Sequence, residues 1–228
     1  KWDSLTIDSH LVPITAHTPE NPAVAEIVSR WDEVLYKAVG QVSTSPHEVV
    51  YYTKEPWDGR DAQSRSTQTN LGQVITSAMA HAFEPPLEAA IVNGGSIRLD
   101  DFLEGGVTPL DFFRVLPFGD GVLKVQMTGA LLAQVLAYGQ QQKGDGAYLQ
   151  RYGVKPEANG LWTIGGKKIE SQQLYWVATS EFLLRGYDIP FLTPEHPDVR
   201  QVIYPQEGTI STDIRQTIIQ FLKNEQND

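Results

Sequence analysis

The sequence predicts an α/β domain in which helices are layered on a mixed β-sheet. Helical and strand patterns alternate over the first half of the chain, and residues 146–178 show short strand patterns in succession. Gly165 and Gly166 lie between two of these strands and suit a hairpin turn, which adds antiparallel pairing. A chain of 228 residues with 41% hydrophobic residues is long enough for one sizeable domain.

The first residues differ in pattern from the rest. Residues 1–21 carry little helical periodicity, so we expect a connector or leading segment there and a domain over residues 22–228. Pro22 suits the first turn of a helix that continues over residues 23–39 and ends at Gly40. The apolar residues of this helix recur at helical spacing: Val24, Ile27, Val28, Trp31 and Leu35.

Cap and turn residues predict the remaining boundaries. Asn70 can cap a helix that runs to about residue 83, Thr108 precedes a proline suited to a first helical turn, and Thr128 can cap another helix. The expected strands cover residues 48–53, 89–92, 122–127, 161–164, 168–169 and 174–179. The other expected helices cover residues 110–115, 129–140 and 212–223, and a polar loop is expected over residues 54–69.

The composition excludes several classes of partner. A net charge of −10 argues against nucleic acid, because such binding needs clustered Lys and Arg. No apolar stretch approaches the roughly 20 residues of a membrane span. Cysteine is absent, which excludes disulfides, thiolate metal sites and cysteine nucleophiles. We therefore expect no nucleic-acid partner and no membrane span.

The sequence Asn-Gly-Gly-Ser-Ile-Arg at residues 93–98 is the most informative short motif. It follows a short apolar strand, and two glycines at a strand end let backbone N–H groups approach a ligand closely. The amide of Asn93 and the guanidinium of Arg98 add directional donors of the kind that oxyanions such as phosphate need. The same residues also fit a plain turn with a solvated arginine. Two further arginines lie in loop sequence, Arg60 and Arg65.

Four segments of the chain together resemble one known family. They are the stretch from Arg60 through Arg65 to Gly72, the motif at residues 93–98, Leu-Pro-Phe-Gly at residues 116–119, and residues 179–188 with Phe182 and Asp188. Their order and spacing resemble the C-terminal domain of the 5′-nucleotidase family, which includes UDP-sugar hydrolases. The resemblance covers roughly residues 40–222.

The resemblance implies a substrate-binding role for this domain, with a nucleotide or related phosphate ester as the ligand. It assigns Arg60, Arg65 and Arg98 to the phosphates and Asn93 to phosphate or ribose. Phe118 and Phe182 would sandwich the base, and Asp188 would accept hydrogen bonds from the ribose. Taken alone, the residues also allow core positions for both phenylalanines and a turn position for Asp188.

The resemblance also implies that catalysis belongs to a separate N-terminal metallophosphatase domain, which would hold two divalent metal ions. Within this chain we expect no catalytic residue, no metal site and no cofactor, and we predict that the chain alone is inactive. Asp8 and His10 mimic the opening of a metallophosphatase motif, but no suitably spaced Asn-His or Gly-His partners follow. A periplasmic or extracellular location is implied by the resemblance alone.

One stretch departs from the family pattern. Residues 185–190 carry Tyr187 and Ile189 where the family usually has glycines. The alternatives are therefore a cyclic nucleotide, a nucleotide sugar or another phosphate ester as substrate, or a stand-alone ligand-binding or interaction module without hydrolase activity.

Overall fold

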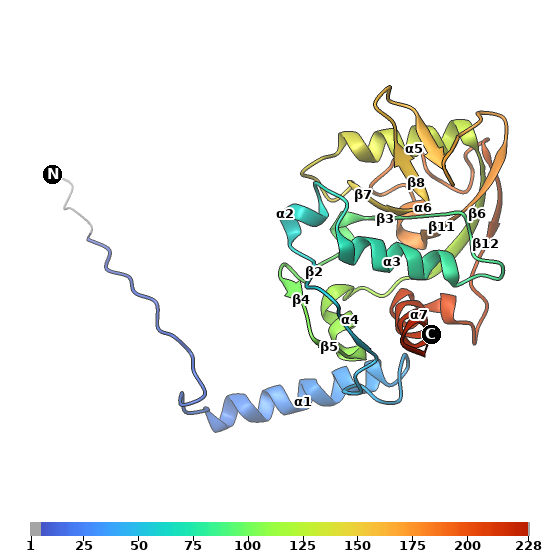
Figure 1. Ribbon diagram of the computed structural model, residues 1–228. Helices are drawn as coiled ribbons and strands as arrows, with labels where there is room; N and C mark the ends of the chain where they lie inside the picture. The colour runs from blue at the N-terminus through green and yellow to red at the C-terminus, as the bar shows by residue number, and fades with distance from the viewer. Residues whose placement is uncertain (1–5, 228) are drawn as a thin grey trace. The chain divides into compact units, whose positions relative to one another are not determined.

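The computed structural model describes residues 6–227, and the chain divides into two compact units (Figure 1). The first unit extends to Ala38 and holds nearly all of α1 (Pro22–Val39), whose bounds agree with the prediction. Residues 6–21 form no helix or strand, and the first five residues of the predicted connector lie outside the described part. The apolar side chains at helical spacing in α1, Val24, Ile27, Val28, Trp31 and Leu35, are exposed in this structure, with Trp31 at 68%, whereas Val39 is buried.

The second unit, from Val39 onward, is built around a five-stranded sheet in the order β12-β6-β11-β3-β7. Strands β3 (Ala89–Asn93) and β11 (Leu174–Ser180) run parallel to each other. The pairings of β6 (Val122–Thr128), β7 (Leu149–Tyr152) and β12 (Val199–Ile203) are antiparallel. The predicted mixed sheet is therefore confirmed.

Helices cover both faces of this sheet (Figure 1). Helix α5 (Gly129–Gln141) packs on one face, whereas α3 (Asn70–His81) packs on the other together with α7 (Ile214–Asn227). Successive residues of β3 point to opposite faces, so Ala90 joins the core beneath α3 and Ile91 joins the core beneath α5. The buried apolar strand predicted from the sequence is thus shared by two cores.

The remaining elements are short and pair locally. Helix α4 (Pro109–Val115) begins with a capping box in which Thr108 and Asp111 bond reciprocally. The hairpin predicted at Gly165 and Gly166 is confirmed within a small sheet of order β10-β9-β8. The other short elements are β1 (Tyr51–Tyr52), β2 (Trp57–Asp58), α2 (Asp61–Ser64), β4 (Phe102–Leu103), β5 (Gly106–Val107), β8 (Val154–Pro156), β9 (Trp162–Ile164), β10 (Lys167–Lys168) and α6 (Glu181–Leu184).

Two predicted segments are wrong in detail. The strand expected over residues 48–53 is reduced to β1, and the loop expected over residues 54–69 contains β2 and α2. The cause is that β1 and β2 pair only with the two-residue strands β5 and β4, not with the main sheet.

The predicted cap of α3 is also wrong. Thr69 caps the helix, since its Oγ1 accepts a hydrogen bond from the Gly72 N–H at 3.0 Å. The Asn70 side chain instead accepts from the Asp58 N–H at 2.7 Å and thereby ties the helix to β2. The helix ends at His81, two residues before the expected boundary.

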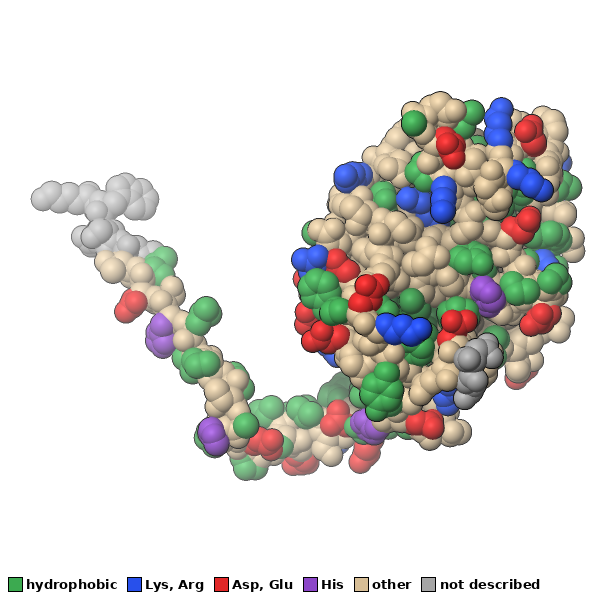
Figure 2. Space-filling view, viewed as in Figure 1, with side chains coloured by type: hydrophobic (Ala, Val, Ile, Leu, Met, Phe, Trp, Pro, Cys, Tyr) green, Lys and Arg blue, Asp and Glu red, His purple; other side chains and the backbone are tan. Residues whose placement is uncertain are grey.

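The surface of the described residues carries both signs of charge. On the face drawn in Figure 2, acidic and basic side chains are interspersed over the second unit. Among the described residues, no helix has the length and apolarity that crossing a bilayer requires.

Candidate functional site

Three turns leave the same edge of the main sheet. Because β3 and β11 are parallel, Asn93 and Ser180 end their strands at one edge. Strand β6 runs antiparallel to β11 and pairs Val122 with Ser180, so β6 begins where β11 ends. The turns after β3, before β6 and after β11 therefore converge, although their residues are far apart in the sequence.

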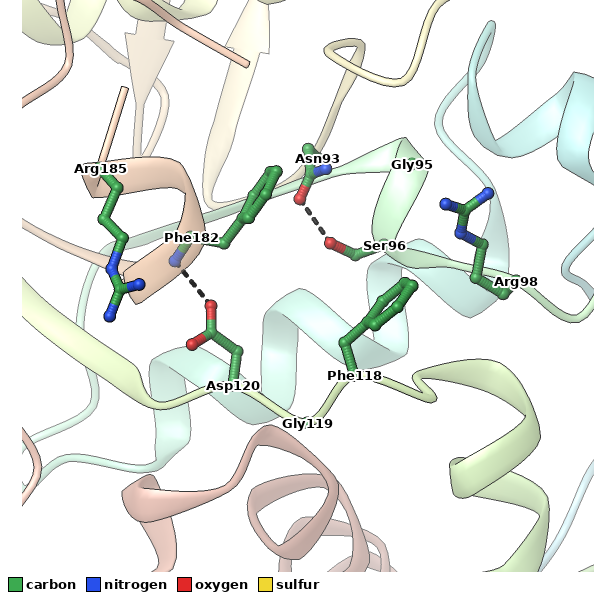
Figure 3. Close-up of a pocket in the computed structure, with 9 residues that line it drawn as sticks. All are labelled: Asn93, Gly95, Ser96, Arg98, Phe118, Gly119, Asp120, Phe182 and Arg185. Atoms are coloured by element: carbon green, nitrogen blue, oxygen red, sulfur yellow. Dashed lines mark hydrogen bonds between the residues drawn. The ribbon is translucent and has the colours of Figure 1, made fainter. Parts of the chain in front are cut away.

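A cavity of about 400 Å³ lies where these turns meet (Figure 3). This volume lies within the range of roughly 300–1,000 Å³ that small-molecule sites occupy. Its walls combine apolar rings, amide and hydroxyl groups, and charges of both signs. The lining residues are Asn93, Gly95, Ser96, Arg98, Phe118, Gly119, Asp120, Phe182 and Arg185.

Two phenylalanine rings from different turns line the cavity. Phe118 is 74% exposed and Phe182 is 37% exposed, so neither ring is part of a hydrophobic core. In Figure 3 both rings are directed toward the space between the turns. The Phe182 ring also contacts the Tyr187 ring at a centroid distance of 5.2 Å, and the Arg98 guanidinium carbon lies 5.6 Å from the Phe118 centroid. Tyr187, a departure from the family pattern, thus supports one wall of the cavity.

The side chain of Asn93 is oriented by two partners. Its Nδ2 donates to Oδ2 of Asp188 at 2.7 Å, and its Oδ1 accepts from the Ser96 hydroxyl at 2.5 Å. Asp188 does not itself line the cavity, but it is hydrogen-bonded to Asn93, which does. This contact joins the turn after β3 to the segment that follows α6.

The three predicted arginines occupy different positions. Arg98 lines the cavity. Arg65 does not, and its Nε donates to Asp61 at 2.7 Å, but its guanidinium lies beside Gly146, whose carbonyl accepts from the Gly95 N–H. Arg65 therefore borders the wall of the cavity.

Arg60 is not brought to this cavity. Its guanidinium donates to both oxygens of Asp58 at 2.9 and 2.7 Å and lies 4.6 Å from the centroid of the Phe102 ring. The Arg60 side chain is engaged within the β2–β4 region in this structure.

The loop that carries Arg65 is held by close backbone packing. Gly94 approaches Ser64 so closely that a Cβ on Gly94 would lie 2.2 Å from the Ser64 carbonyl oxygen. The buried Gln150 amide donates to the carbonyls of Ser64 and Thr67 at 2.7 and 2.6 Å and accepts from the Thr69 N–H at 3.0 Å. The absence of a side chain at Gly94 therefore allows the loop that carries Arg65 to pack directly against the turn after β3.

Sequence reasoning did not assign Asp120, Ser96 or Gly119 to the site. Asp120 is partly buried, and this burial raises the pKa of its carboxyl, which a hydrogen bond from the Phe182 N–H partly offsets. Arg185 is exposed and pairs with Glu181 while lining the cavity. The available signals were the place of Ser96 inside the motif at residues 93–98 and the closeness of Gly119 and Asp120 to Phe118 and of Arg185 to Phe182 in the sequence.

Asp188→Asn is expected to raise the melting temperature at pH 7. Burial raises the pKa of Asp188 above the ordinary 3.8, with Asp145 acting in the same direction and Asn93 and Arg65 opposing it. The native state therefore binds this proton more readily than the unfolded state, and the free energy of unfolding falls as pH rises through the raised pKa. Calorimetry should show the gain at pH 7 and a smaller difference near pH 3. The exposed Asp101→Asn is the control, and a lower melting temperature for Asp188→Asn at pH 7 would contradict the expectation.

No group of three or more His, Cys, Asp or Glu side chains in residues 6–227 is arranged to hold a metal ion. The arrangement at the sheet edge instead offers flat rings, an oriented amide and a guanidinium around one hollow. These features define an α/β domain with a cavity whose lining is chemically suited to a flat, polar or anionic small molecule.

Comparison with known proteins identifies the family. Residues 49–193 match the family model described as "5'-nucleotidase, C-terminal domain". The chain is 29% identical over 200 residues to the trifunctional nucleotide phosphoesterase protein YfkN of Bacillus subtilis, covering 78% of this chain and 13% of that protein. It is 34% identical over 139 residues to a 5′-nucleotidase of Vibrio cholerae, covering 58% and 24%.

The fold agrees with this assignment. The crystal structure of a 5′-nucleotidase precursor from Thermus thermophilus matches with a TM-score of 0.66 at 21% identity, over 85% of this chain and 40% of that one. The chain belongs to the family of 5′-nucleotidase C-terminal domains, as the four sequence segments predicted. It spans between about an eighth and a quarter of the length of these two curated relatives.

Proposed function

We propose that this chain is the substrate-recognising domain of a nucleotide phosphohydrolase and that its cavity binds a nucleotide. The observation that carries the proposal is that Phe118 and Phe182, from separate turns, line one cavity with Asn93 and Arg98. A flat base between two exposed rings gains about 1–3 kcal/mol per stacking contact in nucleic-acid complexes. Stacking accepts any base, so we propose broad base tolerance.

The polar groups around the rings support binding of the remaining parts of a nucleotide. Arg98 offers a planar fork of donors suited to a phosphate, and Arg65 borders the same wall. The Asn93 amide and the Asp188 carboxylate behind it offer donors and acceptors for a ribose. Arg60 would reach such a ligand only after leaving Asp58, so we propose a phosphate role for it only with that rearrangement.

We further propose that hydrolysis requires a metal-holding domain other than the one described here. The support is that the matched part of this chain covers only 13% and 24% of the two curated relatives, and that residues 6–227 present no metal-ligand cluster. On this proposal the 228-residue chain binds nucleotide without hydrolysing it. A periplasmic or extracellular location for the parent protein is a further proposal that rests on the family alone.

The binding proposal is tested by calorimetric titration of the 228-residue chain with AMP, adenosine and ribose 5-phosphate. AMP is expected to bind more tightly than either part. Arg98→Gln is expected to weaken AMP about tenfold and to leave adenosine within twofold, because a charge-assisted hydrogen bond contributes roughly 1.5–3 kcal/mol when formed. Arg114→Gln, on an exposed arginine outside the cavity lining, is the matched control. Equal binding of AMP and ribose 5-phosphate would refute base recognition.

A further inference from the structure

The turn that carries Phe118 is bonded to the helix that carries Phe182 through one carboxylate. Oδ2 of Asp120 accepts the Phe182 N–H at 2.7 Å, as Figure 3 shows, and Oδ1 accepts the Gly121 N–H at 3.0 Å. Beside this contact, the Gly121 carbonyl accepts the Glu181 N–H at 3.1 Å. Asp120 thus stands between the two ring-bearing segments and contacts both.

The other side of the same turn rests on the C-terminal helix. The Asp120 carbonyl accepts the Ile214 N–H at 2.8 Å. Gly119 has φ +51° and lies so close to Arg215 that a Cβ would overlap its guanidinium, which a bidentate pair with Asp213 holds in place. The base of the turn is therefore held by α7, and its contact with α6 is made by the Asp120 side chain together with the Gly121 carbonyl.

The carboxylate is matched to this task by its number of acceptors. Each oxygen of Asp120 accepts one backbone N–H, whereas an asparagine amide has one acceptor oxygen and two donors. The Asp120 carboxylate lies here although it is partly buried, and burial disfavours its charged form. Local folding of a four-residue helix does not require this, because Ser180 already caps α6 at the Leu183 N–H.

We propose that Asp120 is a positioning residue that sets the gap between the Phe118 and Phe182 rings, so that a flat base fits between them. The inference rests on the proposed function. A sandwiched base needs a gap of about 7 Å, twice the optimal carbon–carbon separation of about 3.5–4 Å. If the gap between the two rings widens or tilts, much of the stacking contact on both faces of the base is lost, while Arg98 at the phosphate end stays in position.

The test uses the 228-residue chain with Asp120→Ala and Asp120→Asn, and with Asp101→Ala as the control. Asp101 is an exposed carboxylate that also accepts the backbone N–H of a phenylalanine, Phe102, but it lies outside the cavity lining. Calorimetry measures the affinity for AMP, UMP and ribose 5-phosphate. Fluorescence quenching of 2-aminopurine riboside 5′-monophosphate reports stacking directly.

Asp120→Ala is expected to weaken AMP and UMP by a similar factor of about ten, equivalent to about 1.4 kcal/mol, with ribose 5-phosphate within twofold. Quenching of the bound 2-aminopurine nucleotide should fall, and Asp120→Asn should restore part of both signals because it keeps one acceptor. Retained binding of ribose 5-phosphate shows that the variant is folded.

Three results would overturn the inference: unchanged affinity for both nucleotides, an equal loss for ribose 5-phosphate, or a loss confined to one base, which would indicate that Asp120 reads the base edge. Failure of the proposed function looks different. In that case the native chain would show no preference for AMP over ribose 5-phosphate, whatever residue 120 is.

Discussion

Phe118→Ala and Phe182→Ala are each expected to weaken AMP binding by about 1–3 kcal/mol, or roughly five- to 150-fold. Each substitution removes one of two exposed rings that line the cavity, and the remaining ring can stack on only one face of the base. Because both side chains are exposed, their removal leaves no buried void, and the melting temperature should change little. Calorimetric titration with AMP and ribose 5-phosphate measures the effect, and only AMP should be affected.

Phe102→Ala is the matched control for these variants. Phe102 is another exposed phenylalanine, at 44%, and it lies against Arg60 outside the cavity lining. Its removal should leave AMP affinity within twofold. If either Phe118→Ala or Phe182→Ala binds AMP as tightly as the native chain, a base sandwiched by these rings is refuted.

Gly94→Ala is expected to lower the free energy of unfolding by about 1–3 kcal/mol, the usual cost of overpacking. The added Cβ would lie 2.2 Å from the Ser64 carbonyl oxygen, and backbone cannot move aside as a flexible side chain can. The loop from Ser64 to Thr69 must shift and strain the three hydrogen bonds of Gln150. Urea denaturation monitored by circular dichroism measures the loss.

Gly146→Ala gives the comparison for this loss of stability. Its Cβ would meet its nearest atom, on Arg65, at 3.4 Å, an ordinary contact distance. This variant should unfold within about 0.5 kcal/mol of the native chain, as substitutions away from strained or buried features usually do. A Gly94→Ala variant as stable as Gly146→Ala would show that the Ser64 loop yields freely.

The parts of the fold that the sequence predicts well are those that local chemistry decides. Thr128 before a periodic apolar run, Pro109 after Thr108 and the Gly165–Gly166 turn each act on immediate neighbours, and their elements form as expected. Strand β12 was not predicted, because its residues alternate poorly and it pairs only at the edge with β6. Thr69 rather than Asn70 caps α3 because the Asn70 side chain bonds to Asp58 in β2. The local sequence around α3 gives no sign of this contact, since Asp58 lies twelve residues earlier in the chain.

The same distinction applies to the site. Asn93 and Arg98 share a motif whose chemistry is visible in six residues, and the structure places both at the cavity. Phe118 and Phe182 are brought to one cavity by the pairing of β6 with β11. No local sequence pattern reveals this pairing, so the prediction that both rings belong to one site depended on the family resemblance. The position of Asp120 at the site could not be predicted, because its partners are backbone N–H groups, which every residue except proline carries.

Because three turns converge at one edge of the sheet, the residues that line the cavity differ from the residues that form the two cores. Both cores are made by the sheet and the helices packed on it, while the groups that face the hollow come from the end of β3, the turns and the short helix α6. Exchange of a few residues in those connections therefore alters which molecule is held while the interior stays intact. A scaffold of this kind lends itself to new specificities by grafting, one connection at a time.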